Sequence, residues 1–313
     1  MLRFVLRRLA SGVVLTVATS VVTFFLLYAA GGNIARRILG PQATTVGIRA
    51  KQHELGLDRP ILAQFGHWVS HALRGDFGSS WFDNLPVTQV IGDRLPVTLS
   101  LVVGATLVTA VVSVLLGVLA ARRGGWIDRL VQFVSMLGFA VPSFLVAIAL
   151  VLVFAIKLGL VAPTGYTRFT DSPSGWLSSI VLPVIALSIG SVSGVAQQIR
   201  GSLLDAQRQD WVRVLRSHGL PESRVLYLHM LRNAAGPALS VLGLQFVSLI
   251  GGAVIVEQIF AVAGLGQAAV SATSQGDVPV VMGLVIVVGA IVVVLNLLVD
   301  LLLGWLNPKV RRA

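Results

Sequence analysis

Long apolar stretches, separated by shorter segments that hold most of the charge, dominate the pattern along this 313-residue chain. Six of them qualify as spans, at approximately Leu9–Ala30, Val97–Ala121, Leu130–Ile156, Leu177–Ile199, Pro237–Ala261 and Val280–Leu306. Each approaches or exceeds the roughly 20 apolar residues that a bilayer-crossing helix needs. The runs are continuously apolar rather than alternating, which favours helices over a membrane barrel. We therefore predict an all-α polytopic membrane protein with about six transmembrane helices.

Composition supports this prediction. Hydrophobic residues make up 55% of the chain and charged residues 12%, whereas soluble domains carry about 25% charge. Cysteine is absent, which excludes disulfides and thiolate metal sites. The first apolar stretch follows basic residues, as in a signal peptide, but it is longer than the usual apolar region of about 7–15 residues. We expect it to be a retained first helix.

Basic residues concentrate in alternate loops, which predicts the orientation of the spans. They explain the net charge of +11 better than nucleic-acid binding does. The side expected to be cytoplasmic holds Arg3, Arg7, Arg8, Arg122, Arg123, Arg129, Arg200, Arg208, Arg213, Arg216, Arg224, Arg232, Lys309, Arg311 and Arg312. The opposite short loops hold only Arg168, with Lys157 at a span end. We predict one transmembrane domain over residues 1–313 with both termini cytoplasmic, an extracytoplasmic segment at 31–96 and a cytoplasmic loop at 200–236.

The segment 31–96 has its own helical pattern. Apolar residues recur at helical spacing from Ile61 to Leu73, Asp58 is placed to cap this helix, and Gly75 is placed to end it. Its apolar face should pack on the spans or on a partner. His67 and His71 lie one turn apart, but no carboxylate nearby completes a metal site, so we favour an ordinary surface.

The loop between the fourth and fifth spans contains two short amphipathic patterns. Asp210 can cap the first helix, which places Trp211, Val214 and Leu215 on one face. Gly219 can end it in a left-handed conformation, and Pro221 begins the second helix. Amphipathicity alone does not distinguish a helix lying on anionic lipid from an element that docks on a soluble partner.

This loop resembles the coupling loop of ATP-binding-cassette importer permeases, most closely those of the dipeptide/oligopeptide family. The matching loop residues are Asp210, Arg213, Arg216, Gly219, Leu220, Arg224, Val225, His229, Leu231, Arg232, Asn233, Ala234 and Pro237. Further matches in order are Leu6–Leu9, Leu55–Pro60, Gly75–Ser80, Pro142–Phe144, Gly243–Gln245, Glu257–Phe260, Gly264–Gly266, Asp277–Val281, Asn296–Asp300 and Asn307–Lys309. Ala263 stands where the family has a proline. The resemblance covers nearly the whole chain.

The resemblance implies a type I ABC importer permease fold in the bacterial plasma membrane. It implies three kinds of partner: a second, related permease subunit, one or two ABC ATPase subunits, and an extracytoplasmic solute-binding protein. ATP and Mg²⁺ would be bound by the ATPase, and this chain would bind no cofactor or metal and would not be an enzyme. The coupling residues implied are Asp210, Trp211, Arg213, Arg216, Gly219, Leu220, Arg224, His229, Arg232 and Asn233. Relatives import di- or oligopeptides, and related systems carry nickel, glutathione or haem.

Several residues within the spans are candidates for the translocation path or gate. They are Pro142, Phe144, Gln245, Glu257, Asn296 and Asp300. A charge at bilayer depth costs about 2.5–3.5 kcal/mol, so Asp300 should face protein or water, and we favour a structural contact over a proton relay. Glu257 could line the path or reach the interface, and Pro142 should kink its helix.

Motifs of other functional classes are absent. The chain has no phosphate-binding loop of the G-x-x-x-x-G-K-[ST] type and no metalloprotease or serine-hydrolase signature. The competing hypothesis is an ion-coupled secondary transporter that uses Asp300. A membrane scaffold without transport activity is a third class, against which the polar residues in the spans argue weakly.

Overall fold

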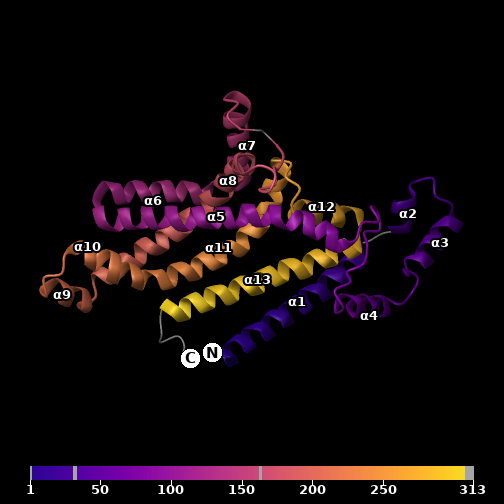
Figure 1. Cartoon of the computed structure of the whole chain (residues 1–313), viewed down its shortest axis with the longest axis horizontal. Coiled ribbons are helices and arrows are strands. Elements are labelled where there is room, and N and C mark those ends of the chain that lie inside the picture. Colours follow the sequence, from indigo (N-terminus) through magenta and orange to yellow (C-terminus); the bar gives the residue numbers. More distant parts are fainter. Residues whose placement is uncertain (1, 31–33, 162–163, 307–313) are drawn as a thin grey trace. The chain divides into compact units, whose positions relative to one another are not determined.

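The chain is seen in a computed structural model that describes residues 2–30, 34–161 and 164–306. These residues form helices joined by turns, and a single antiparallel bridge between Ser79 and Pro86 is the only extended pairing among them (Figure 1). Within the described ranges, five helices are long and apolar enough to cross a membrane, and a bent helix pair can supply a sixth crossing. The prediction of an all-α, multi-pass protein is confirmed.

The chain divides into two compact units. Of the described residues, unit 1 contains those within 97–266 and 295–306, and unit 2 contains those within 2–96 and 267–294. Two long helices contribute to both units, namely α5 (Val87–Arg123) and α13 (Val278–Leu306).

Unit 2 contains the first span and the segment that follows it. Its helices are α1 (Leu2–Ala30), α2 (Ile34–Leu39), α3 (Thr45–Glu54), α4 (Ile61–Ala72) and most of α12 (Leu265–Gln275). Ile61, Phe65 and Trp68 of α4 pack against buried Phe24 of α1 and Met282 of α13. The predicted helix and its packing on the spans are therefore confirmed.

The ends of α4 differ in part from the prediction. Gly75 has φ +81° just beyond the helix, as expected of a terminating glycine. Asp58 does not cap α4, because Pro60 occupies the cap position without a side-chain hydrogen bond and the Asp58 carboxylate lies 3.8 Å from His53 Nδ1. Proline lacks a backbone N–H, so the helix begins there with one fewer backbone N–H group that needs a hydrogen-bond acceptor.

Unit 1 is built around α8 (Pro173–Gln207), the most buried of the long helices. Helices α6 (Gly125–Ala140), α7 (Ser143–Leu150) and α11 (Leu231–Ile259) pack on it. The short helices α9 (Asp210–Ser217), α10 (Glu222–Arg224) and the wide π-helical turn η2 (Val225–Met230) lie between α8 and α11. A second π-helical segment, η1 (Val151–Lys157), continues α7.

The third apolar stretch is not the single kinked helix that we predicted. Helix α6 ends at Ala140, and α7 begins at Ser143 after a bend of 94°. Pro142 explains the break, because it has no N–H to donate and its ring disfavours helical geometry at the residue before it. Val141 accordingly takes an extended conformation with ψ 119°.

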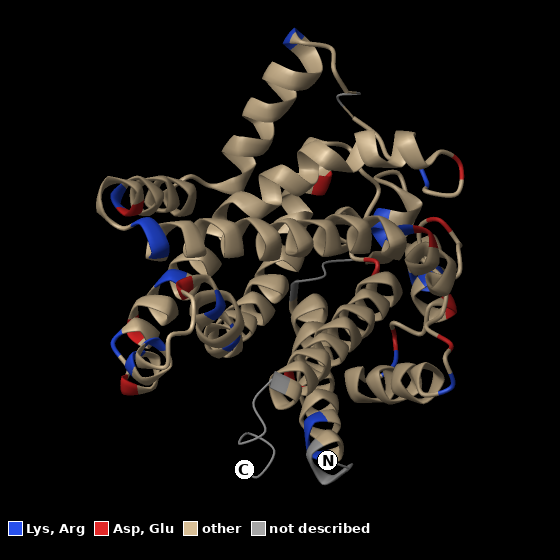
Figure 2. Cartoon of the chain, turned by 60° about the vertical axis from the view of Figure 1, so that its left-hand side comes forward, with Lys and Arg blue, Asp and Glu red and all other residues tan. Residues whose placement is uncertain are grey.

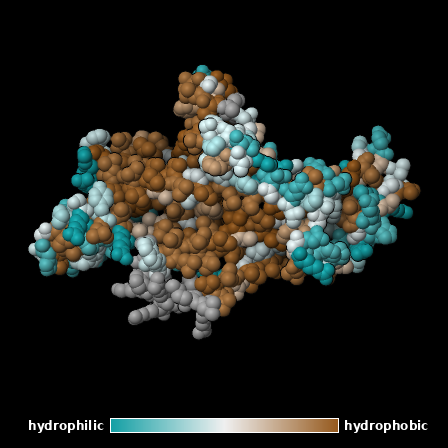
Figure 3. All heavy atoms as spheres, in the orientation of Figure 1, coloured by the Kyte–Doolittle hydropathy of each residue, from teal (hydrophilic) through white to brown (hydrophobic). Residues whose placement is uncertain are grey.

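The distribution of charged and apolar side chains on the surface follows the helices. Charged residues gather mainly at helix ends and in the connecting segments, while the middles of the long helices carry few (Figure 2). Large apolar side chains such as Val14, Leu107 and Leu115 are exposed along those middles, and the space-filling view shows this surface as hydrophobic (Figure 3). Exposed apolar side chains in such numbers fit a surface that faces lipid.

Candidate functional site

Helix α9 is anchored in unit 1 by its apolar face. Val212 is buried, and Trp211 and Leu215 are partly buried against the same cluster, which includes Leu203 of α8 and Met230 of η2. The expected face was wrong in one residue, because Val214 is 52% exposed and Val212 takes its place. In a helix of only two turns, packing against α8 and η2 decides which apolar residue is buried.

The Gly219 turn follows α9 as predicted. Gly219 has φ +76°, and its N–H donates to Arg216 O at 2.9 Å while Leu220 N donates to Leu215 O at 3.3 Å. Arg216 also donates to the Glu222 carboxylate across the turn. This hydrogen bond is the main reason that the pKa of Arg216 is raised above its usual value. The turn is therefore held by backbone and side-chain bonds together.

Asp210 does not cap α9 with its side chain. Gln209 occupies the cap position without a side-chain hydrogen bond, and Asp210 is the first helical residue. Its carboxylate accepts from Arg213 at 3.3 Å, one turn further along. A carboxylate in the first turn still interacts favourably with the positive end of the helix dipole.

The second arm of the loop is not a separate short helix. It begins after Pro221 as α10 and passes through η2 directly into α11, which gives one apolar helical run from Glu222 to Ile259. The wide turn at η2 is marked by a bond from Leu231 N to Leu226 O. Single π-helical turns of this kind recur at functional sites.

A hollow of ≈ 370 Å³ lies between α9 and this second arm. It is lined by Trp211, Leu228, His229, Arg232 and Asn233. Four of these five residues belong to the set that the resemblance assigned to coupling. Arg213 and Arg224 are exposed on the same loop. We define the α9–Gly219 turn–α10–η2 segment, residues 210–233, as the coupling knob.

Glu257 is the most buried of the candidate path residues. It is 0% exposed, and its Oε1 accepts a hydrogen bond from Thr98 Oγ1 of α5 at 2.5 Å. The same Thr98 oxygen accepts from Leu265 N at 2.8 Å, so one hydroxyl joins α5, α11 and the turn that follows α11.

The turn after α11 fits closely around the Glu257 carboxylate. A Cβ on Gly264 would collide with this carboxylate, and one on Gly266 would lie 2.6 Å from Val254 Cα. Both positions therefore require glycine. Sequence reasoning singled out Glu257 and the two glycines separately but missed Thr98, because nothing near Thr98 in the sequence indicates a partner 159 residues away.

The remaining path candidates are not brought together with Glu257 by any described contact. Gln245 Oε1 accepts from Ser191 Oγ at 3.3 Å and so links α11 to α8. Phe144 lies partly exposed on α7, just after the break at Pro142. Asn296 and Asp300 lie one turn apart on α13, and Asp300 falls within its last two turns. This position near a helix end fits the alternative that Asp300 is close to an interface.

An ion pair that sequence reasoning did not single out joins α6 to α8. Arg200 donates to both carboxylate oxygens of Asp128, with a distance of 2.6 Å from Nη2 to Oδ2, and Gln132 donates to the same carboxylate at 3.0 Å. Arg200 was noted only as part of the basic pattern. A bidentate pair of this kind fixes the relative orientation of the two side chains as well as the distance between them.

Among the described residues, no group of three or more His, Cys, Asp or Glu side chains is placed to hold a metal ion. The rings of His67 and His71 lie 4.3 Å apart, and His71 Nδ1 faces His67 O at 2.9 Å. The basic residues Lys309, Arg311 and Arg312 fall outside the described residues.

Comparison with known proteins identifies the family. The binding-protein-dependent transport system inner membrane component family matches residues 113–312, and its N-terminal companion matches residues 1–102. A putative peptide transport system permease protein of Brucella abortus is 39% identical over 312 residues, 99% of each chain. The oligopeptide permease AppB of Bacillus subtilis is 32% identical over 316 residues, covering 99% of this chain and 100% of AppB. The glutathione permease GsiC of Salmonella typhimurium is 33% identical over 312 residues, 99% of each chain.

Solved structures show the same fold. A chain of the inward-facing MetNI methionine ABC transporter matches with a TM-score of 0.57 at 14% identity, covering 70% of this chain and 97% of that one. A chain of an amino acid ABC transporter solved with histidines matches with a TM-score of 0.51 at 21% identity, covering 72% and 95%. This protein belongs to the family of binding-protein-dependent transport system inner membrane components and is a multi-pass ABC transporter permease of the bacterial inner membrane.

Proposed function

We propose that this chain is one permease subunit of an ATP-driven importer for short peptides. The three relatives described above are named for peptides, oligopeptides and glutathione, and glutathione is itself a tripeptide. The chain forms half of the translocation path beside a second, related permease. A solute-binding protein delivers the peptide from outside, and a separate ATPase binds and hydrolyses ATP with Mg²⁺.

The observation that carries this proposal is the construction of the coupling knob. Its apolar side is anchored by Val212 and Met230 in the core of unit 1, while Arg213, Arg224 and Arg232 are exposed. A segment that merely rested on lipid would direct its apolar side chains outward into the interface. Here Val212, Val225 and Met230 are turned inward, and the exposed side of the knob combines its arginines with the apolar side chains of Val214, Tyr227 and Leu228. This mixed, ordered surface is suited to a groove in a soluble protein.

The knob is also built to transmit force. Its second arm runs without interruption into α11, so displacement of the knob must move α11 or bend η2. In the proposed cycle, ATP binding closes the ATPase pair, the knob moves with it, and the helices of unit 1 change from inward-open to outward-open. The ion-coupled alternative depends on Asp300, and the described part of the chain offers it no comparable feature.

The test is an Arg232→Glu variant of the chain, reconstituted with its second permease, ATPase and binding protein. Arg232 is exposed and lines the hollow of the knob, so its replacement leaves the core intact. Reversing a charge in a docked interface costs several kcal/mol, and about 1.4 kcal/mol is tenfold in affinity. We expect the variant to lose the ATPase on purification, or to lose uptake of a labelled tripeptide by more than about tenfold.

The matched control is Arg208→Glu. Arg208 is also an exposed arginine, and it lies just outside the knob at the end of α8. This variant should keep both the ATPase and peptide uptake. Equal behaviour of the two variants, or normal ATPase binding and uptake in Arg232→Glu, would contradict a docked knob.

A further inference from the structure

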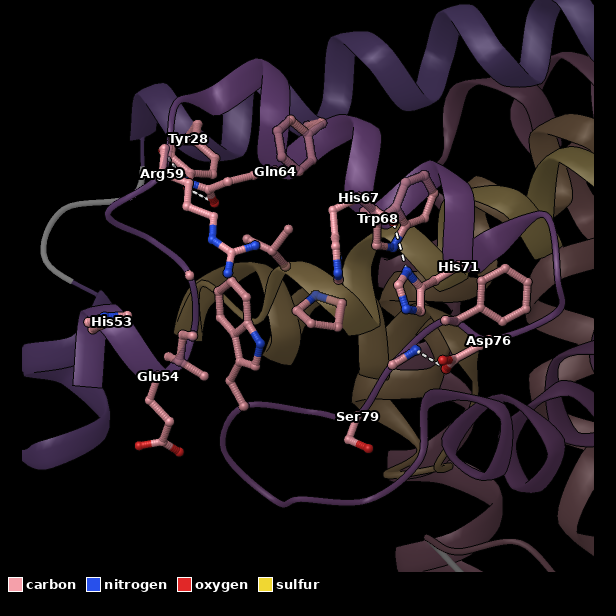
Figure 4. A pocket seen from close by; sticks show the side chains of 18 residues that line it. Tyr28, His53, Glu54, Arg59, Gln64, His67, Trp68, His71, Asp76 and Ser79 are labelled. Atoms are coloured by element: carbon pink, nitrogen blue, oxygen red, sulfur yellow. Dashed lines mark hydrogen bonds between the residues drawn. The ribbon is translucent and has the colours of Figure 1, made fainter. Parts of the chain in front are cut away.

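A cavity in unit 2 has no role in the proposed transport cycle. It has a volume of ≈ 360 Å³ and is bounded by α1, by α3 and α4 with the loops around them, and by the start of α13. Its size falls within the range of about 300–1,000 Å³ that is typical of small-molecule sites. Figure 4 shows Arg59, His67, Trp68, His71 and Asp76 around it, with Tyr28 at one end.

The cationic side chain of this cavity is Arg59, and the turn that carries it is held by a hydrogen bond to its backbone. Gln64 Nε2 donates to Arg59 O at 2.8 Å, and Gln64 Oε1 accepts from the Tyr28 hydroxyl. The Gln64 amide thus connects α4, α1 and the turn that carries Arg59. The Arg59 side chain extends from this fixed point toward the cavity (Figure 4). A guanidinium is the side chain best suited to bind a carboxylate through two parallel hydrogen bonds.

A second donor lines the same cavity. Trp68 Nε1 is buried and has no hydrogen-bond acceptor among the described residues. A buried donor without a partner is energetically unfavourable, so a ligand oxygen at this wall would supply a missing interaction. The acidic groups of the lining already have partners, because Glu54 accepts from Lys51 at 2.7 Å and Asp76 accepts from Gly78 N at 2.9 Å.

The rest of the wall is aromatic and apolar. Phe24, Trp81, Phe77 and Pro279 line the cavity together with the ring of Trp68. Phe24 is buried and contacts the Tyr28 ring at a centroid distance of 5.4 Å, so this part of the wall is packed rather than mobile. Such a wall favours a flat or bulky apolar group next to the polar contacts.

We propose that this cavity binds a small organic carboxylate with an aromatic or large apolar body. Arg59 binds the carboxylate, Trp68 Nε1 contributes a second hydrogen bond, and the aromatic wall covers the body of the ligand. This site is separate from the coupling knob. Its occupancy does not depend on the peptide cargo proposed above, so it can fail or hold independently of that proposal.

The test uses the purified full-length chain in detergent, with N-acetyl-L-phenylalanine as the probe and its uncharged amide as the matched ligand. Binding is measured by calorimetry and by the change in tryptophan fluorescence, to which Trp68 and Trp81 of the cavity contribute. We expect saturable binding of the acid at least about tenfold tighter than that of the amide, a difference of about 1.4 kcal/mol. Arg59→Gln should abolish the preference for the acid. Trp68→Phe should weaken acid binding about threefold, because it removes the N–H donor but keeps an aromatic side chain in the wall.

The control variant is Arg74→Gln, because Arg74 is an exposed arginine of the same segment that does not line the cavity. It should bind the acid as the unaltered chain does. Retention of the acid preference in Arg59→Gln, or equal loss in Arg74→Gln, would overturn the assignment. Absence of saturable binding at millimolar probe would also overturn it and would favour a protein loop as the occupant.

Discussion

Two threonines of α5 offer a direct test of the buried contacts in unit 1. Thr98 and Thr109 are 4% and 0% exposed, but they differ in their partners. Thr98 Oγ1 donates to Glu257 and accepts from Leu265 N, whereas Thr109 Oγ1 has no hydrogen-bond partner among the described residues. The same near-isosteric substitution, threonine to valine, should therefore change stability in opposite directions.

The magnitudes follow from the bonds involved. Thr98→Val removes a buried hydrogen bond, worth about 0.5–1.5 kcal/mol, and leaves Leu265 N–H without its acceptor, which costs about 1–3 kcal/mol. We expect a total loss of about 2–4 kcal/mol. Thr109→Val removes a buried hydroxyl that has no partner and should stabilise unit 1 by about 0.5–2 kcal/mol.

The assay is the thermal midpoint of the purified chain in detergent, measured by the loss of its monodisperse size-exclusion peak. One kcal/mol shifts Tm by about 2–4 °C in a domain of 150–250 residues. Thr98→Val should thus lower Tm by roughly 4–16 °C and Thr109→Val should raise it by roughly 1–8 °C. Shifts of the same sign and similar size in both variants would refute the assigned partners.

Two further measurements test other contacts. Gly264→Ala should lower Tm by roughly 2–12 °C, because its Cβ would collide with the Glu257 carboxylate and overpacking costs about 1–3 kcal/mol; an unchanged Tm would contradict the fit of the turn. Asp277, in the turn just before α13, accepts from Ser80 Oγ at 2.5 Å, and burial raises its pKa above the usual value. The folded state then holds this proton more tightly than the unfolded state, so this group's contribution to stability falls as pH rises from the unfolded pKa through the raised folded pKa. Asp277→Asn should remove that part of the pH dependence of Tm, and identical profiles for the two proteins would contradict it.

Patterns that act within one stretch of sequence predicted the structure well. The apolar runs located the spans, and the Ile61–Leu73 periodicity located α4, because both depend on local geometry and burial. Gly219 was placed correctly at a left-handed turn because few other residues adopt that conformation. Pro142 indicated a disruption, but its local effect does not determine a bend of 94°, which depends on the packing of α7 against α8 and α11.

Features that depend on contacts between distant segments were not predictable. Thr98 resembles any other threonine in an apolar helix until α5 and α11 are packed together. Asp128 pairs with Arg200 across 72 positions, and no periodicity connects them. The choice of Val212 over Val214 as the buried residue of α9 likewise depends on tertiary packing, because a helix of eight residues is too short for its sequence to fix its rotation.

The continuity of α11 connects the coupling knob with the buried contacts of Glu257 in unit 1. The run from Glu222 to Ile259 has 38 residues, and at 1.5 Å per residue it extends for about 57 Å. One of its ends carries the coupling knob, and the other carries Glu257, which is bonded to Thr98 of α5 and enclosed by the Gly264 turn. A force applied to the knob therefore reaches the Glu257 end through one helix, and the only wide turn in this run is η2 beside the knob. If the knob is moved by an ATPase, η2 is where the motion can be absorbed, and the Thr98–Glu257 bond is where it passes to α5.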